Sequence, residues 1–310
     1  MSMSSSPLHK ITSISALMRL LGQPEPLHPL VALIDYDSTT VDLSHAGDKF
    51  SLDFYKISFK TTFHGQVRYG QDHYDFDEGG LAFLSPSQVV TMSPERSGYE
   101  GYSLFFHPDL IRSYPLANTI SHYGFFSYSV SEALFLSRKE KAVIATLFAT
   151  IAAELENNID HFSQDILVSQ LELLLNYSNR FYARQFITRK TVNNELIAKL
   201  DGYLDQRFGG GGGESREGDA VGLPTVQELA AHLHVSPRYL SDLLRSSIGQ
   251  NAQEYIHLRL IEKAKTILTN SNETVAEIAY RLGFEHPQSF SKLFRKKTDL
   301  SPVEFRRSFN

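Results

Sequence analysis

The sequence predicts a two-domain α+β protein, in which an N-terminal antiparallel β-barrel with helices precedes a C-terminal all-α domain. Short segments rich in aromatic and β-branched residues fill positions 31–107, apolar residues recur at helical spacing from 131 onward, and five consecutive glycines stand at 209–213. A chain of 310 residues is long enough for two domains and a connector. We expect the barrel over 1–130, a helical connector or dimerisation region over 131–207, a Gly-rich linker over 208–223 and the all-α domain over 224–310.

The β-rich segment consists of short strands separated by turns. Residues 50–63 and 100–111 carry strand patterns, and Gly70, Gly79-Gly80 and Ser85-Pro86 mark turns between shorter strands. Close spacing of short strands predicts an antiparallel barrel or a double-sheet roll. Strand aromatics such as Phe59 and Phe83 fill a packed core in the simpler interpretation.

The alternative interpretation of the strand aromatics is a pocket for a small, partly apolar effector. In that case the polar residues that we expect to contact the effector are Arg68, Tyr69 and His73.

Helical periodicity follows the barrel. Residues 140–156 and 163–186 place apolar side chains every three or four positions, which predicts two helices. Leu173, Leu174 and Leu175 widen the apolar face of the second helix. A face this wide packs on the barrel, on a neighbouring helix or on a second subunit, and we expect a homodimer contact beside core packing.

The glycine-rich segment at 208–223 is interpreted as a linker. Five consecutive glycines and a polar tail bury too little surface to hold one conformation. A phosphate-binding loop is the alternative, but no Gly-Lys-Ser/Thr follows the glycines and no strand precedes them.

One sequence pattern occurs twice after Pro224. Glu228-Leu229-Ala230 recurs as Glu277-Ile278-Ala279 at an offset of 49 residues, and the offset becomes 50 from Phe290 onward. We therefore expect one additional residue in the turn of the second copy.

Each copy predicts two helices joined by a short turn, which is a helix-turn-helix. Thr225 and Thr274 cap the first helices, and Pro237 and Pro287 stand in the first turn of the second helices. The expected helices are 226–232, 237–247, 275–282 and 287–297, with an amphipathic helix over 252–269 between the copies and a closing helix from 302.

The net charge of −5 is unevenly distributed. Residues 224–310 hold 12 Lys and Arg against 9 Asp and Glu, and residues 281–310 hold seven basic against three acidic residues. A basic surface concentrates DNA even on an acidic protein, although a solvated helix face is the simpler interpretation of charge alone. No basic segment leads into a long apolar run, so we expect a cytoplasmic protein without membrane contact.

Four segments of the C-terminal region are RLIEKAK (259–265), VAEIAYRLGF (275–284), SFSKLFRK (289–296) and SPVEFR (301–306). In these segments the chain resembles the AraC/XylS family of bacterial transcription regulators, and the resemblance covers residues 225–307. In that family the second helix of each unit enters the major groove of double-stranded DNA. The resemblance therefore implies an AraC-type DNA-binding domain over 224–310.

Carried onto this sequence, the resemblance implies two sets of DNA contacts. The expected base contacts are Arg238, Ser241, Asp242, His286, Gln288, Ser289 and Lys292, and the expected phosphate contacts are Arg245, Arg295 and Lys296. For each residue the alternative is plain solvent exposure. Two positions depart from the family pattern: Asp242 stands where many members carry a basic residue, and Asp299 replaces a glycine.

The resemblance also implies a cupin-like sensor barrel at the N-terminus. A metal-dependent cupin needs a His-x-His pair with a later Glu and His, whereas His64, His73 and His107 are scattered. The chain contains no cysteine, which excludes disulfides, thiol chemistry and cysteine-ligated zinc. We expect no metal, no cofactor and no catalytic residue.

These patterns favour a regulator that binds specific DNA sequences as a homodimer and is controlled by a small-molecule effector in the barrel. RNA polymerase is a further partner if the chain activates transcription, and the choice between activator and repressor stays open. One alternative is a constitutive DNA-binding regulator whose barrel only dimerises. The other is a cupin-type enzyme with a helical tail.

Overall fold

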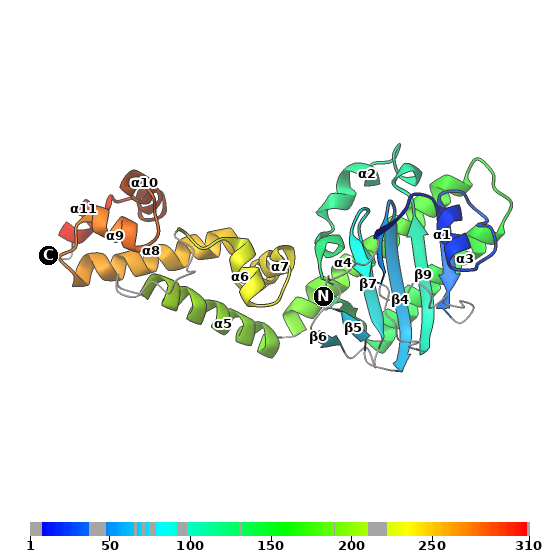
Figure 1. Cartoon of the computed structure of the whole chain (residues 1–310), viewed down its shortest axis with the longest axis horizontal. Helices are drawn as coiled ribbons and strands as arrows, with labels where there is room; N and C mark the ends of the chain where they lie inside the picture. The colour runs from blue at the N-terminus through cyan, green and yellow to red at the C-terminus, as the bar shows by residue number, and fades with distance from the viewer. Residues whose placement is uncertain are drawn as a thin grey trace, which may run out of the picture. The chain divides into compact units, whose positions relative to one another are not determined.

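The computed structural model describes residues 8–36, 48–64, 67–69, 72–74, 79–91, 98–129, 132–188, 190–209 and 222–308 (Figure 1). The chain forms two compact units, Met1–Gln185 and Phe186–Asn310. The first is β-rich with helices and the second is all helical, which confirms the predicted two-domain α+β class. Closure of the strands into a barrel stays a prediction.

Two sheets and a short hairpin form the β-structure of the N-terminal unit. A five-stranded sheet has the order β10-β7-β4-β9-β2, a three-stranded sheet has the order β1-β3-β8, and β5 pairs with β6. The strands are β1 (Leu8–Ile11), β2 (Val31–Asp35), β3 (Lys49–Leu52), β4 (Tyr55–His64), β5 (Val67–Tyr69), β6 (Asp72–Tyr74), β7 (Gly80–Leu84), β8 (Val89–Thr91), β9 (Gly98–Phe106) and β10 (Leu134–Phe135).

Helices α3 (Arg138–Glu156) and α4 (Ser163–Thr188) cover one face of the five-stranded sheet, and Figure 1 shows α4 in green behind the strands. The ring centroids of Phe59 in β4 and Phe148 in α3 lie 5.4 Å apart, and those of Phe83 in β7 and Tyr182 in α4 lie 6.2 Å apart. Aromatic burial of this kind is a large favourable term in a core. We call this side of the sheet the helical face.

Helix α1 (Ile14–Leu20) packs against the opposite face of the same sheet. Its buried side chains form one apolar cluster with residues from β2, β3 and β9: Ile14, Leu17, Met18, Ala32, Ile34, Leu52, Phe54 and Phe105. Because Leu52 belongs to the three-stranded sheet, this cluster joins the two sheets. We call this side of the five-stranded sheet the inner face.

Two strand predictions differ from the structure. The pattern at 50–63 divides into β3 and β4, which belong to different sheets. The strand predicted to reach Ile111 ends at Phe106, because His107 caps a 3₁₀ turn at Pro108–Leu110. Proline has no N–H to donate to a neighbouring strand. Helix α2 (Leu116–Thr119) and 3₁₀ turns at Ile120–His122 and Gly124–Ser127 follow.

The C-terminal unit contains the two predicted helix-turn-helix copies. Each copy has a helix of 7 residues followed by one of 12 residues. The turn contains residues 233–236 in the first copy and 282–286 in the second, which confirms the predicted additional residue. The helices are α5 (Lys190–Gly209), α6 (Val226–His232), α7 (Pro237–Ile248), α8 (Ala252–Asn270), α9 (Val275–Arg281), α10 (Pro287–Thr298) and α11 (Pro302–Arg307).

Capping boxes begin four of these helices. The side chains of Thr225, Asn251, Thr274 and Ser301 each accept a hydrogen bond from the backbone N–H three residues later, and the glutamate at that later position accepts one from the cap residue's N–H. Each box satisfies two N–H groups that a helix start would leave without a partner. The predicted threonine caps are therefore confirmed.

Helix α5 braces the C-terminal unit. The Tyr255 hydroxyl in α8 donates to Asp201 at 2.5 Å, and Arg259 donates to Asp205 at 3.1 Å. Leu200 and Leu204 of α5 are buried. Residues 190–207 of this helix fall in the predicted connector 131–207, and the helix packs against α7 and α8. Most of the Gly-rich linker lies outside the described residues; Phe208 and Gly209 are the last residues of α5.

Left-handed backbone at two glycines shapes the turns and helix ends of this unit. Gly283 has a φ of 93° in the second turn, and Gly249 has a φ of 76° at the end of α7. A Cβ at Gly283 would lie 2.6 Å from the Gly222 carbonyl oxygen, whereas one at Gly249 would meet nothing within 4 Å. At the end of α10 the same backbone conformation is held by Asp299, with a φ of 62°.

Substituting alanine for each of these two glycines distinguishes the cost of backbone strain from the cost of steric crowding. We expect Gly249→Ala to lower the free energy of unfolding by about 1–2 kcal/mol, the cost of left-handed backbone at an L-residue. Gly283→Ala loses about 1–3 kcal/mol more, because its Cβ also overpacks the Gly222 backbone. Urea denaturation of the full chain measures both, and equal losses would contradict the crowding at Gly283.

Candidate nucleic-acid interface

Helix α7 presents one apolar and one polar side. Ser236 caps its start, Pro237 occupies the first position, and Tyr239, Leu240, Leu243 and Leu244 are buried. The opposite side carries Arg238, Ser241, Asp242 and Arg245, the residues predicted for DNA contact. The periodicity of the helix thus places all four on the side away from its core.

Asp242 lies between two arginines of α7. Arg238 Nε donates to Asp242 Oδ2 at 3.0 Å, and Arg245 Nη1 donates to Asp242 Oδ1 at 2.7 Å. The Asp242 side chain is only 17% exposed, against 44% for Arg238 and 55% for Arg245. The carboxylate therefore holds two more exposed guanidinium groups in place, which sequence reasoning missed although the i,i+4 and i,i+3 spacings indicate it.

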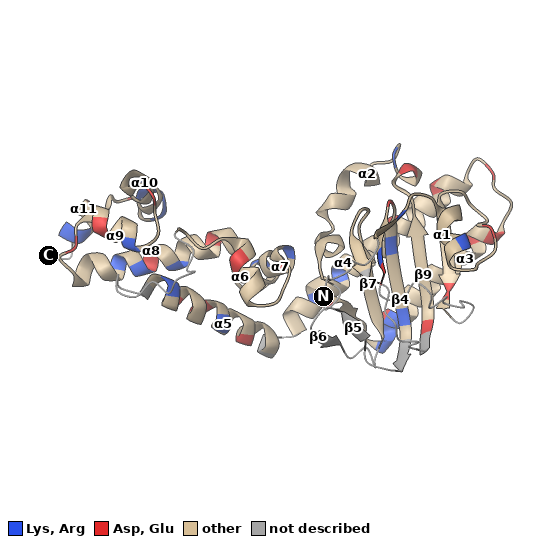
Figure 2. Cartoon of the chain, in the orientation of Figure 1, with Lys and Arg blue, Asp and Glu red and all other residues tan. Residues whose placement is uncertain are grey.

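Helix α10 is likewise divided into a buried and an exposed side, but its exposed residues differ in charge from those of α7. Phe290 and Phe294 are buried on one side, and Gln288, Ser289, Lys292, Arg295 and Lys296 are exposed. Figure 2 marks the Lys and Arg positions of the described residues in blue and the Asp and Glu positions in red. His286 is exposed at the N-cap and makes no side-chain capping bond. By the repeat offset of 50, Lys292 occupies the position of Asp242, and Gln288 that of Arg238. The two helices therefore present different chemistry from one framework.

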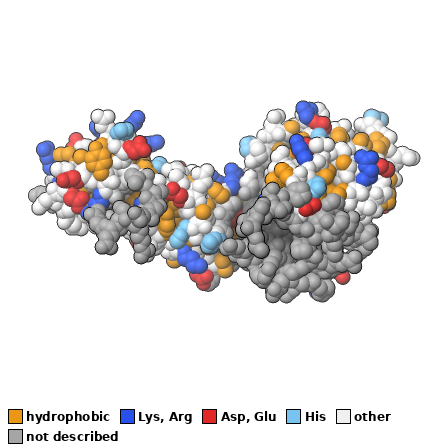
Figure 3. All heavy atoms as spheres, in the orientation of Figure 1, with side chains coloured by type: hydrophobic (Ala, Val, Ile, Leu, Met, Phe, Trp, Pro, Cys, Tyr) orange, Lys and Arg blue, Asp and Glu red, His pale blue; other side chains and the backbone are white. Residues whose placement is uncertain are grey.

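Basic residues gather at the end of α10 close to α8. Burial lowers the pKa of His257 in α8, and the charges of Lys297 and Lys296 lower that pKa further. The Lys and Arg side chains at the surface of the C-terminal unit are blue in Figure 3. A concentration of exposed cations attracts polyanions.

Two other arginines of the basic C-terminal run have structural partners. Arg281 donates to Glu273 at 2.6 Å. Arg306 donates to the carbonyl oxygens of Leu268 and Glu273, at 3.0 and 2.6 Å. These contacts fasten α9 to the segment that precedes it and α11 to the end of α8. Counting charges in the sequence therefore overstates the number of cations without a structural role.

The predicted effector contacts lie in the hairpin of β5 and β6. Arg68 pairs with His73 and Tyr69 with Asp72 in the backbone register. The side chains of Arg68, Tyr69 and His73 lie outside the described residues.

The inner face of the five-stranded sheet carries buried polar groups that sequence reasoning missed. Lys60 is 6% exposed, Ser58 is 7% exposed and Ser103 is 1% exposed. The Ser103 hydroxyl lies 2.5 Å from the Tyr36 hydroxyl and 3.5 Å from that of Ser58. Burial, and to a smaller extent the charge of Lys56, lower the pKa of Lys60 to about 7.

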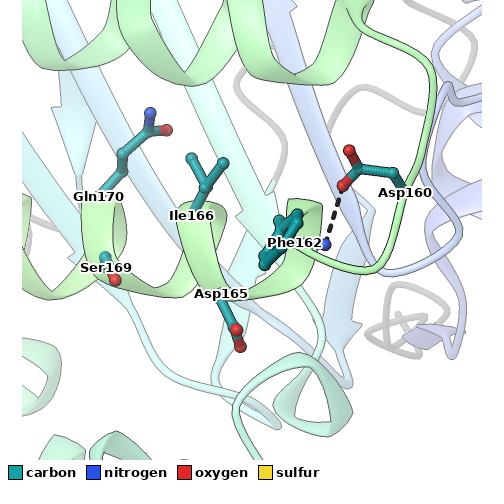
Figure 4. Close-up of a pocket in the computed structure, with 6 residues that line it drawn as sticks. All are labelled: Asp160, Phe162, Asp165, Ile166, Ser169 and Gln170. Carbon is teal, nitrogen blue, oxygen red and sulfur yellow. Dashed lines mark hydrogen bonds between the residues drawn. The ribbon is translucent and has the colours of Figure 1, made fainter.

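An exposed apolar surface lies at the start of α4. Ile159, Phe162 and Ile166 are 59%, 55% and 40% exposed. Phe162 and Ile166 border an open hollow of about 460 Å³, which is lined by Asp160, Phe162, Asp165, Ile166, Ser169 and Gln170 (Figure 4). Gln170 Oε1 is buried and has no hydrogen-bond partner among the described residues. Figure 4 shows Asp160 accepting from the Phe162 backbone N–H at 2.8 Å, which fixes the turn into the helix.

Within the described ranges, no cluster of three or more His, Asp or Glu side chains has the arrangement of a metal site. No helix in this part of the chain has the length and apolar character needed to cross a membrane.

Two family models match the chain, one in each unit. The model described as "AraC-like ligand binding domain" matches residues 45–171. The model described as "Helix-turn-helix domain" matches residues 229–308. The chain belongs to the AraC/XylS family.

Curated relatives of this AraC/XylS-family chain are transcription regulators. YijO of Escherichia coli, an uncharacterized HTH-type transcriptional regulator, is 36% identical over 115 residues, which are 37% of this chain and 36% of YijO. The HTH-type transcriptional activator RhaS of Klebsiella pneumoniae is 31% identical over 144 residues, 46% of this chain and 45% of RhaS. The matches thus span less than half the length of these relatives.

Among solved structures, the C-terminal domain of AraT, a response regulator from Geobacillus stearothermophilus, is 26% identical. The alignment covers 36% of the AraC/XylS-family chain and 84% of that domain, with a TM-score of 0.30.

Proposed function

We propose that this chain is a sequence-specific DNA-binding transcription regulator, controlled by a small molecule bound in its N-terminal unit. The observation that carries the proposal is the pair of 12-residue helices α7 and α10, which expose matched sets of polar and basic residues from two like-built units. The ligand-binding family match at 45–171 supports effector control. A bacterial regulator of this kind acts on DNA in the cytoplasm by binding, without a catalytic step of its own.

In this proposal α7 and α10 enter the major groove. Arg238 offers two donors for the O6 and N7 atoms of guanine, and Gln288 offers one donor and one acceptor for adenine. Ser241, His286, Ser289 and Lys292 contact neighbouring bases, while Arg245, Arg295 and Lys296 contact phosphates. Helix α8, with 19 residues, is about 28 Å long. It holds the two recognition helices at a separation comparable to one turn of DNA, roughly 34 Å.

Asp242 acts as a positioning residue in the first unit. Its carboxylate fixes Arg238 over the groove and Arg245 toward the phosphates through the contacts at 3.0 and 2.7 Å. A direct base contact, in which the Asp242 carboxylate accepts a hydrogen bond from cytosine N4, would compete with its bonds to these two arginines.

A second copy of this chain is the partner that we infer for the start of α4. Phe162 and Ile166 supply the apolar surface of this contact, with 55% and 40% of each residue exposed. Self-association through like surfaces generates a two-fold dimer. A dimer doubles the DNA contacts, which raises affinity without any new kind of contact.

Salt dependence of DNA binding tests the central proposal. We expect Arg295→Ala/Lys296→Ala to reduce the slope of log K against log salt concentration by about 1.8, because two phosphate contacts are lost. Fluorescence anisotropy with DNA sequences selected in vitro measures the slope. The exposed pair Arg138 and Lys139 on α3 provides a matched control, Arg138→Ala/Lys139→Ala, which leaves the slope unchanged. Absence of salt-dependent binding by the wild-type chain would overturn the proposal.

Removing the charge of Asp242 distinguishes a positioning role from a base contact. With Asp242→Asn we expect affinity for non-cognate DNA to rise about tenfold at 0.1 M salt, because one repulsive charge is lost. Preference for the selected site falls, since Arg238 is no longer oriented. Glu195→Gln, at an exposed acid on α5, serves as control. A change of preferred base at one position, with unchanged non-cognate affinity, would favour a direct base contact.

If the chain dimerises through the start of α4, a charge placed in that contact is expected to halve the molecular mass in solution. We expect Ile166→Glu to convert a species of twice 35.0 kDa into one of 35.0 kDa in light scattering, because a charge is placed in the apolar contact. Ile187→Glu is the matched control, since Ile187 is also exposed on α4 and lies about 31 Å along the helix from Ile166. A dimeric Ile166→Glu variant would exclude this surface.

A further inference from the structure

Two lysines follow Lys292 along the exposed side of α10. Lys296 lies one turn after Lys292, and Lys297 is the next residue. Residues four apart lie on the same side of a helix, so Lys296 continues the line of Lys292 toward the C-terminal end of α10. The N-terminal residues of a recognition helix contact base edges. A cation on the same side one turn later is therefore expected at the edge of the groove, beside the phosphates.

Both lysines are exposed, and neither forms an ion pair among the residues that the structure describes. The acids of the neighbouring helices are already engaged with other cations. Asp242 holds two arginines of α7, and Glu273 accepts from Arg281 of α9. The end of α10 thus carries two positive charges that no described acid neutralises by direct contact.

Helix α8 presents a glutamine and a histidine to these lysines. It packs against α10 (Figure 1). Gln253 and His257 lie four residues apart on one side of α8, and Gln253 Nε2 lies 2.9 Å from His257 Nε2. The charges of Lys297 and Lys296 both act on the His257 imidazole, which places it beside the end of α10. We call Gln253, His257, Lys296 and Lys297 the α8–α10 cluster.

The α8–α10 cluster has an excess of positive charge. The charged groups that act on the imidazole are Lys297 and Lys296 of α10 and Glu254 of α8 itself. Glu254 closes the capping box of α8, where its carboxylate accepts from the Asn251 N–H at 3.1 Å. Two ammonium groups thus act on the site, against one carboxylate that already has a backbone partner. An anion would balance this charge.

The hydrogen bond between Gln253 and His257 is compatible with both protonation states of the imidazole. An amide NH2 group only donates, so in the neutral ring His257 Nε2 accepts and Nδ1 carries the proton. In the protonated ring Nε2 donates, and the Gln253 amide turns its oxygen toward it. Because Gln253 is exposed, this turn does not disturb the core. It also directs the amide NH2 away from the ring, where it can donate to an anion.

We propose that the α8–α10 cluster binds one phosphate of the DNA backbone, and that His257 takes up a proton when it does so. The inference rests on the proposed DNA-binding function and adds a contact from outside the two recognition helices. A backbone phosphate is the anion that fits, because Lys296 belongs to the predicted phosphate contacts and the cluster extends them onto α8. Its negative charge stabilises the imidazolium beside the two lysines.

Proton uptake makes DNA binding depend on pH. In the chain without DNA, burial and then the two lysine charges lower the pKa of His257, so the imidazole is neutral at pH 7. In the complex the phosphate raises this pKa. The affinity for DNA therefore rises as pH falls through the pKa of the complex, and the gain is complete below the pKa of the chain without DNA.

Fluorescence anisotropy of the full chain with a DNA duplex selected in vitro, at fixed salt from pH 8 to pH 6, tests the inference. We expect the affinity to rise about tenfold over this range, since uptake of one proton changes log K by up to one per pH unit. His257→Gln retains a hydrogen-bonding side chain and loses the rise. His232→Gln is the matched control and keeps it, since His232 is an exposed histidine on α6 that stacks on Tyr203.

The lysine side of the cluster is tested at constant pH. Lys297→Ala removes one of the two ammonium groups, and we expect it to weaken DNA binding by about threefold to tenfold at 0.1 M salt. Lys199→Ala, at an exposed lysine on α5, leaves the affinity unchanged.

An affinity that does not change with pH, or a rise that persists in His257→Gln, would overturn the inference. A rise that is lost in His286→Gln and retained in His257→Gln would also overturn it, because the proton would then belong to a predicted base contact. Circular dichroism of each variant at both ends of the pH range establishes that it is folded. Salt-dependent binding without pH dependence leaves the proposed function standing, whereas absence of DNA binding overturns both.

Discussion

Both helix-turn-helix units depend on the burial of α8. Its apolar side chains face α7, α9 and α11 as well as α5, and eight of them are buried, from Ala252 to Leu268. Burying a large aliphatic side chain contributes about 1.5–3 kcal/mol, so this single helix is a large share of the stability of the unit. Polar contacts add to this burial: Asp201 and Asp205 of α5 accept hydrogen bonds from α8, and Arg306 donates to the Leu268 carbonyl near the end of α8.

A shared framework leaves the two recognition helices free to differ in charge. Their cores are equivalent, since Leu240 and Leu244 correspond to Phe290 and Phe294 at the repeat offset. Their outer sides are not, because the carboxylate of Asp242 is replaced by the amine of Lys292. The first helix therefore carries two arginines held by an acid, and the second a set of separate cations. Arginines held in one orientation favour selectivity for a base sequence, whereas separate cations favour attraction to any phosphate backbone.

Local rules made much of the C-terminal unit predictable. The helix boundaries here can be predicted to within a residue or two. The features that fix them are the caps at Thr225 and Thr274, the prolines at Pro237 and Pro287 and the repeat itself, because each rule involves neighbours in sequence. The bracing by α5 was not predictable, since Tyr255 and Asp201 are 54 residues apart. Lys60 was missed for a similar reason. Its burial depends on Gly80 and Gly101 in two other strands, and nothing in the segment around Lys60 identifies those partners.

Strand β4 belongs to two environments at once. Phe59 contacts the helices on one side and Lys60, the next residue, faces the opposite side. The sheet between them is a single layer of backbone, so α1 and its apolar cluster pack on one side of the same strands that α3 and α4 cover on the other. Any displacement of β4 therefore moves side chains on both faces at once, because successive side chains of a strand point to opposite sides.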